Sequence, residues 1–162
     1  MKKVFRLFMW ILLILYSGVV LHLLLFGRGV ITDASSWEHI ATTSNFVPFK
    51  TISLQIRQYF VGENRGFALR NLGGNFFLLF PIGFLLPYLV PKINRFWKIA
   101  LGMTAFILIA ELLQALLCIG FFDVDDLIFN VIGGVCGYAL LKVLSFLVRW
   151  IRNKRVTVRT NR

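Results

Sequence analysis

The chain has 162 residues, of which 58% are hydrophobic, and it carries a formal net charge of +11. Its mean hydropathy is +0.77, and its apolar residues form long blocks rather than the spaced pattern of a half-buried helix or strand. These properties exclude an ordinary soluble domain.

Four apolar blocks are long enough to cross a bilayer. Each has about 17 to 23 residues, near the roughly 20 that span the hydrocarbon core. The sequence therefore predicts an all-α, polytopic membrane protein with four transmembrane helices in a single domain covering residues 1–162. The expected spans are Val4–Phe26, Gly74–Val90, Trp97–Ile119 and Leu127–Val148.

The first block resembles a signal peptide because Lys2 and Lys3 precede it. However, it is longer than the usual apolar region of about 7–15 residues, and no small-x-small cleavage site follows Phe26. We expect it to be retained as a membrane helix.

The charges are distributed unequally between the connections. The acidic residues of the connections all fall on one expected side of the membrane: Asp33, Glu38, Glu63, Asp123, Asp125 and Asp126. The other side is basic, with Lys2, Lys3, Arg6, Lys92, Arg95, Lys98, Arg149, Arg152, Lys154, Arg155, Arg159 and Arg162. Because basic connections stay inside, this asymmetry predicts that both termini lie in the cytoplasm. The basic tail, 149–162, is expected to meet anionic membrane lipids, and nucleic acid is not an expected partner.

The two cysteines are not expected to form a disulfide. Cys118 lies at the end of the third block, whereas Cys136 lies well inside the fourth. At about 1.5 Å per residue their depths differ by roughly 10 Å, beyond the ~7 Å that a bridge allows between Cα atoms.

The longest connection, Gly27–Gly73, lies on the outer side in this topology. After Pro48, which favours an extended residue before it, the segment KTISLQIRQYF has helical periodicity. Phe49, Ile56 and Phe60 share a face with Ile52. Two interpretations stay open: an amphipathic helix in the membrane interface, or a cap on the helix bundle.

Polar residues enter the expected spans mainly from the outer side. Asn71 and Asn75 are four residues apart, and Glu111 and Gln114 are three apart, so each pair shares a helix face. Asn130 lies about one turn inside the fourth block. Such residues face one another or water rather than lipid, which predicts one outward-facing polar pocket.

Three carboxylates stand at the start of the fourth block: Asp123, Asp125 and Asp126. We expect them to form the rim of this pocket. Gly133 and Gly137 provide a small-xxx-small spacing for close helix packing, and Pro81 interrupts the second span. That interruption either exposes carbonyls to a ligand or is an ordinary membrane-helix kink.

With these motifs assembled, the chain resembles the VanZ-like family of bacterial membrane proteins over roughly residues 45–137. The matching motifs are Asn45-x-x-Pro48-Phe49, Asn71-x-x-x-Asn75 followed by Pro81-x-Gly83, Glu111-x-x-Gln114 and Asp123-x-Asp125-Asp126-x-x-x-Asn130-x-x-Gly133. Where many relatives have a basic residue before the acidic triplet, this chain has Gly120-Phe121-Phe122. The resemblance implies a bacterial cytoplasmic membrane protein connected with resistance to teicoplanin, a lipoglycopeptide antibiotic, and implies no cofactor and no established reaction.

Three hypotheses follow. The first is a protein that binds a membrane lipid, a lipid-linked cell-wall precursor or a lipoglycopeptide without covalent chemistry, with no catalytic residue and with Glu111 as the buried ionisable group. The second is a metal-dependent enzyme acting on a lipid-linked phosphate, with Mg²⁺ held by the acidic triplet and Asn130 and with Glu111 as general base. The third is that the polar residues only hold the helices together, at about 0.6 kcal/mol per hydrogen bond. Metal binding and oligomeric state remain open at this point.

Overall fold

The computed structural model describes residues 2–26, 42, 44–62, 64–117 and 119–160. Within these residues it contains helices and no strand, apart from an isolated bridge between Asn45 and Asp123. The elements are α1 (Lys2–Phe26), α3 (Lys50–Val61), α4 (Arg65–Leu89), the short 3₁₀ helix η1 (Pro91–Ile93), α5 (Phe96–Leu116) and α6 (Val124–Thr160). Four of them, α1, α4, α5 and α6, are long and apolar enough to cross a membrane, which confirms the predicted fold class.

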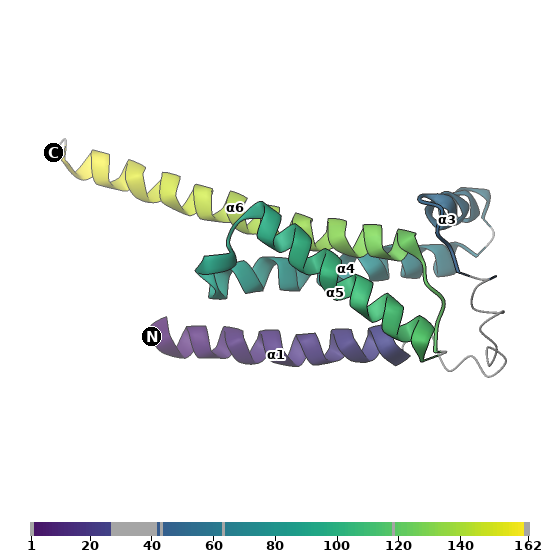
Figure 1. Ribbon diagram of the computed structural model, residues 1–162. Coiled ribbons are helices and arrows are strands. Elements are labelled where there is room, and N and C mark those ends of the chain that lie inside the picture. The colour runs from purple at the N-terminus through teal and green to yellow at the C-terminus, as the bar shows by residue number, and fades with distance from the viewer. Residues whose placement is uncertain (1, 27–41, 43, 63, 118, 161–162) are drawn as a thin grey trace.

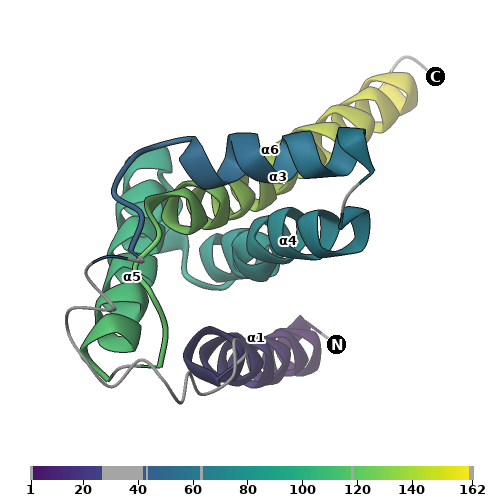
Figure 2. The ribbon, with the colours of Figure 1, turned by 90° about the vertical axis from the view of Figure 1, so that its right-hand side faces the viewer.

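The four long helices form an elongated bundle (Figure 1). The N-terminus of α1 and the C-terminus of α6 lie at the same end, which we call the terminal end. Helix α3 lies across the opposite end, over α4 and α6, and we call this the loop end (Figure 2). An even number of membrane spans is expected to bring the start of α1 and the end of α6 to the same side, as observed.

The helices differ in extent from the predicted spans. Helix α4 begins at Arg65 rather than Gly74, and α6 continues to Thr160 rather than Val148, whereas α5 ends at Leu116 instead of Ile119. Hydropathy locates the part of a helix in hydrocarbon, but it does not limit a helix that continues into water. At 37 residues, α6 is about 55 Å long, well beyond the ~30 Å hydrocarbon core.

The predicted amphipathic helix is present as α3, but its protein-facing side is not its most apolar one. Ile52 and Gln55 are its buried residues. Phe49, Ile56 and Phe60 are exposed, with Phe60 75% accessible. The helix therefore caps the loop end through its Ile52–Gln55 face and leaves an apolar face available to the membrane interface.

Helices α4 and α6 form the most extensive contact in the bundle. Their backbones approach so closely that a Cβ atom added to Gly133 would lie 1.8 Å from the Phe76 carbonyl oxygen. A Cβ added to Gly137 would lie 2.0 Å from the Phe80 oxygen. These separations confirm that the small-xxx-small spacing serves close helix packing.

The proline in α4 has a specific consequence. Pro81 lacks an N–H, so it cannot donate to the carbonyl of Phe77 one turn earlier. The Tyr16 hydroxyl of α1 donates to that oxygen at 3.2 Å and to the Leu78 oxygen at 3.0 Å. The released carbonyl therefore joins α1 to α4.

The bundle surface is largely apolar, and its centre is packed with aliphatic side chains. Leu79 and Ile107 are fully buried, whereas Leu101 is 68% and Phe146 66% exposed. Exposed side chains of this kind around the long helices fit contact with lipid chains. Cys136 is a free thiol, and Cys118 lies outside the described residues, as do Asp33, Glu38 and Glu63.

Candidate functional site

The buried polar side chains gather at the loop end. In the described part of the chain they come from the segment before α3, from α3 itself, from the last turns of α5 and from the first turns of α6. They are Asn45, Gln55, Glu111, Gln114, Asp125, Asp126 and Asn130. By contrast, the buried side chains from mid-bundle to the terminal end are hydrophobic. Hydrophilic groups of separate helices therefore converge at one level of the bundle.

Asp125 binds the N-terminus of α3. Its Oδ1 accepts the Phe49 N–H at 2.5 Å, and its Oδ2 accepts the N–H groups of Thr51 at 2.7 Å and Ile52 at 3.1 Å. The first N–H groups of a helix have no partner inside the helix and attract negative charge. Asp125, only 2% exposed, thus holds α3 on α6.

Asn45 attaches the chain before α3 to the start of α6. Its backbone N–H donates to the Phe122 oxygen at 2.8 Å, and its backbone oxygen accepts the Val124 N–H at 3.0 Å. Its side-chain Nδ2 donates to Asp123 Oδ1 at 3.0 Å and to Thr51 Oγ1 at 3.1 Å. Asn45 therefore positions α3 rather than offering free groups to a ligand.

Asp126 connects α6 to α4. Its Oδ1 accepts a hydrogen bond from Asn75 Nδ2, and its backbone oxygen accepts one from Asn130 Nδ2 at 2.8 Å. Glu111, with no exposed surface, accepts the Asp123 N–H on Oε2 at 3.2 Å. The acidic residues are thus tied to their neighbours through amide and backbone donors.

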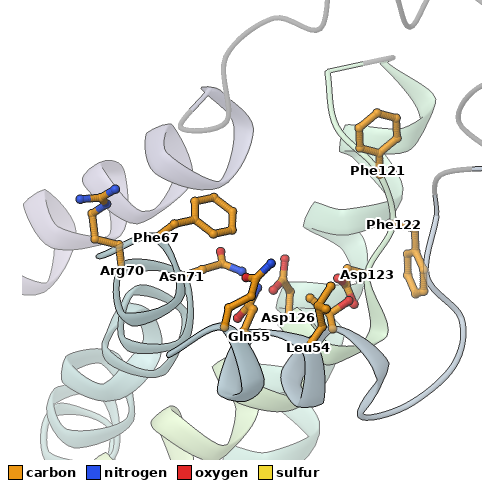
Figure 3. Close-up of a pocket in the computed structure, with 11 residues that line it drawn as sticks. Leu54, Gln55, Phe67, Arg70, Asn71, Phe121, Phe122, Asp123 and Asp126 are labelled. Atoms are coloured by element: carbon orange, nitrogen blue, oxygen red, sulfur yellow. The ribbon is translucent and has the colours of Figure 1, made fainter. Parts of the chain in front are cut away.

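One cavity formed by described residues at this end, which we call the α3 cavity, has a volume of about 630 Å³. It lies between α3, α4 and the start of α6. In Figure 3 the side chains of Gln55, Asn71 and Asp126 point toward one another inside it. Its full lining is Thr51, Leu54, Gln55, Gln58, Phe67, Arg70, Asn71, Phe121, Phe122, Asp123 and Asp126.

The second, which we call the α1 cavity, has a volume of about 410 Å³ and lies between α1, α4 and the end of α5. It is lined by Tyr16, Leu23, Leu24, Arg70, Asn71, Gly74, Asn75, Phe77, Leu78 and Gln114. Because Arg70 and Asn71 line both cavities, the two adjoin along this turn of α4.

Gln114 has one bonded and one unbonded polar atom in its side chain. Its Nε2 donates to the Leu24 backbone oxygen of α1. Its buried Oε1 has no hydrogen-bond partner among the described residues, and neither has the buried Oδ1 of Asn130. Because a buried acceptor without a donor costs free energy, the Gln114 oxygen, which faces Gly120 in the connection between α5 and α6, favours a hydrogen-bond donor such as water there.

Of the five residues expected to form the pocket, some line a cavity and the others are buried in the packing between the helices. Asn71 lines both cavities, and Asn75 and Gln114 line the α1 cavity. Glu111 and Asn130 are buried but line neither cavity.

The acidic triplet, expected to form the rim, is divided in the same way. Asp123 and Asp126 line the α3 cavity, whereas Asp125 is turned to the N-terminus of α3 and lines neither.

Gln55 and Arg70 are among the cavity residues that sequence reasoning did not predict. The helical periodicity of the α3 segment groups Gln55 with Arg57 and Gln58 on the polar face, opposite the face of Ile52, Ile56 and Phe60. Arg70 was placed before the second span, although α4 already includes it. The position of Arg70 immediately before Asn71 was the sequence signal for a cavity residue, because a charged side chain next to a membrane span is costly and usually has a function.

A metal centre of three or more protein ligands is not formed by the described residues. No group of three or more His, Cys, Asp or Glu side chains lies close enough to hold an ion there. Both Asp125 oxygens accept backbone N–H groups, and Asp123 Oδ1 accepts from Asn45 and from the Asp125 N–H. Asp123 and Asp125 are therefore engaged in holding the chain around the start of α3, whereas Asp126 accepts from the Asn75 side chain.

Together, the spans and the buried polar groups define a multi-pass membrane protein of the helix-bundle class, with two adjoining cavities at its loop end. The VanZ/LLP1 family model matches residues 11–146, and the chain belongs to this family. No match was found among curated proteins or among solved structures.

Proposed function

We propose that this protein binds an amphiphilic molecule in the α3 and α1 cavities, without covalent chemistry, at the outer face of the bacterial cytoplasmic membrane. The role would be in resistance to teicoplanin-type lipoglycopeptides or in handling envelope lipids and their precursors. The observation that carries the proposal is the convergence of buried polar side chains beside two adjoining cavities at one end of an otherwise apolar bundle.

The charge distribution supports this orientation. Lys92, Arg95 and Lys98 lie in the connection at the terminal end, together with Arg6 near the start of α1 and Arg149 near the end of α6. Basic residues of short connections favour the cytoplasmic side. With the terminal end in the cytoplasm, both cavities lie at the exterior end of the bundle, on the side of the membrane where lipoglycopeptides act.

The cavity chemistry suits a ligand with both hydroxyl or amide groups and hydrocarbon. In the α3 cavity Gln55 and Asn71 can both donate and accept hydrogen bonds, and the Asp126 carboxylate accepts them. Phe67 and Leu54 supply apolar wall. Mostly apolar walls with a few convergent polar groups are typical of small-molecule sites, and both volumes lie within or near their range of about 300–1,000 Å³.

The geometry favours binding over the metal-dependent enzyme. An enzyme using Mg²⁺ at the acidic triplet needs carboxylate oxygens directed at one point. Asp125 instead directs both oxygens at α3, and Glu111, the candidate base, lines neither cavity. Asp123 and Asp126 are the two carboxylates that remain at the α3 cavity.

Drug-susceptibility testing examines the proposal. Cells expressing the wild type should tolerate more teicoplanin than cells carrying an empty vector. Asp126→Asn, which replaces a cavity carboxylate, and Glu111→Gln, which perturbs the packing beneath it, should lose most of this protection at equal expression. Arg57→Gln on the exposed side of α3 is the matched control and should keep it.

Equal protection by all variants would contradict the proposal. Release of phosphate from a lipid-linked substrate by purified protein, dependent on Mg²⁺ and abolished by Glu111→Gln, would establish the enzyme instead.

A further inference from the structure

The junction between the two cavities carries a cation that the proposed binding mode does not yet use. Arg70 lines both cavities and forms no hydrogen bond or ion pair with any described residue. In Figure 3 its guanidinium points away from Asn71, Gln55 and Asp126. One turn of α4 thus presents an amide to the α3 cavity and a guanidinium at the boundary with the α1 cavity.

The two cavities differ in chemical character on either side of Arg70. Asp123 and Asp126 line only the α3 cavity, so that cavity favours hydroxyl donors and repels an anion. Leu23, Leu24 and Leu78 line only the α1 cavity, which favours hydrocarbon. An anionic group is therefore best placed between them, beside Arg70.

We propose that Arg70 binds a phosphate that joins a sugar-like head group in the α3 cavity to one hydrocarbon chain in the α1 cavity. This inference rests on the proposed function and names the class of ligand: a single-chain, phosphate-linked glycolipid. A planar guanidinium provides paired donors that match a phosphate. The α1 cavity of about 410 Å³ has room for a segment of one hydrocarbon chain, so we expect a single-chain lipid to bind better than a two-chain lipid.

The test measures binding of three probes to the purified full-length protein in nanodiscs. The probes are a polyprenyl phosphate carrying one N-acetylglucosamine, the same polyprenyl sugar without phosphate, and phosphatidylglycerol. The wild type should bind the first most tightly. Arg70→Gln should weaken that binding about tenfold or more while leaving the phosphate-free probe unchanged.

Two variants serve as controls. Arg65→Gln removes a cation from the same helix that lines neither cavity, and it should bind all probes like the wild type. Arg70→Lys keeps the charge and should retain more of the phosphate selectivity than Arg70→Gln does.

The inference is overturned if Arg70→Gln binds the phosphate probe as the wild type does, if both sugar probes weaken equally, or if phosphatidylglycerol binds as tightly as the single-chain probe. The proposed function fails separately. Should Asn71→Leu abolish binding of the phosphate-free probe while Arg70→Gln changes nothing, the cavities remain a ligand site and only the phosphate assignment is lost. Should no probe bind and no variant alter drug susceptibility, both proposals fail.

Discussion

Replacing Asp125 by asparagine should release helix α3 from the bundle. The wild-type carboxylate accepts three backbone N–H groups, one on Oδ1 from Phe49 and two on Oδ2 from Thr51 and Ile52. Asparagine keeps one oxygen, loses the negative charge and directs an NH₂ group at a backbone N–H. At least one hydrogen bond is therefore lost and replaced by a donor–donor contact.

The expected cost follows from these contacts. One hydrogen bond to a charged acceptor contributes about 1.5–3 kcal/mol. The charge at a helix N-terminus contributes a further ~0.3–1 kcal/mol. Together they give about 2–4 kcal/mol of α3 docking free energy, which corresponds to a roughly 30- to 700-fold rise in the open population at about 1.4 kcal/mol per tenfold.

Hydrogen–deuterium exchange on the purified protein measures this population directly. Exchange of the amides of Phe49, Thr51 and Ile52 should accelerate by the stated factor in Asp125→Asn. Asp126→Asn is the matched control, because it removes a neighbouring carboxylate that accepts from Asn75 of α4, and it should leave these amides within about twofold of wild type. Unchanged exchange in Asp125→Asn, or equal acceleration in the control, would refute the reasoning.

Two further predictions concern the helix contacts that form the bundle. Gly133→Ala should lower the free energy of unfolding by about 1–3 kcal/mol in a thermal unfolding assay, because the new methyl group would lie 1.8 Å from the Phe76 oxygen. Gly18→Ala is the control and should leave the free energy of unfolding unchanged, because nothing lies within 4 Å of its added Cβ. Equal effects of the two substitutions would contradict the close packing of α4 and α6. Tyr16→Phe should cost about 1 kcal/mol and loosen α1, because the Phe77 oxygen loses its hydroxyl donor; exchange of α1 amides measures this, and an unchanged rate would show that the bond contributes little.

The sequence predicted the four spans because hydrophobic length is a direct consequence of bilayer thickness. It also predicted that Asn71, Asn75 and Gln114 would face inward, because polar groups avoid lipid. All three line the described cavities. Hydropathy alone could not give the helix ends, since Arg65–Gly73 is polar enough to lie in the interface and still continue α4.

The roles of the individual carboxylates could not be derived from spacing. Asp123, Asp125 and Asp126 were expected to act as one rim, yet Asp125 lies 2% exposed against α3. That arrangement depends on where α3 docks, which is a tertiary contact between residues more than seventy positions apart. Gln55 was overlooked for the same reason, because a glutamine on an amphipathic helix reads as solvent-facing until its neighbours are known.

The most direct measurement of the central account is chemical labelling of Asn71→Cys in a background where Cys118 and Cys136 are alanine. In intact cells a membrane-impermeant maleimide should label this cysteine from outside, and a bound single-chain glycolipid phosphate should slow the reaction. Leu101→Cys, at a lipid-facing position that is 68% exposed, should stay unlabelled. Labelling of Asn71→Cys only in inside-out vesicles, or at a rate that no amphiphile changes, would contradict an outward-facing ligand site.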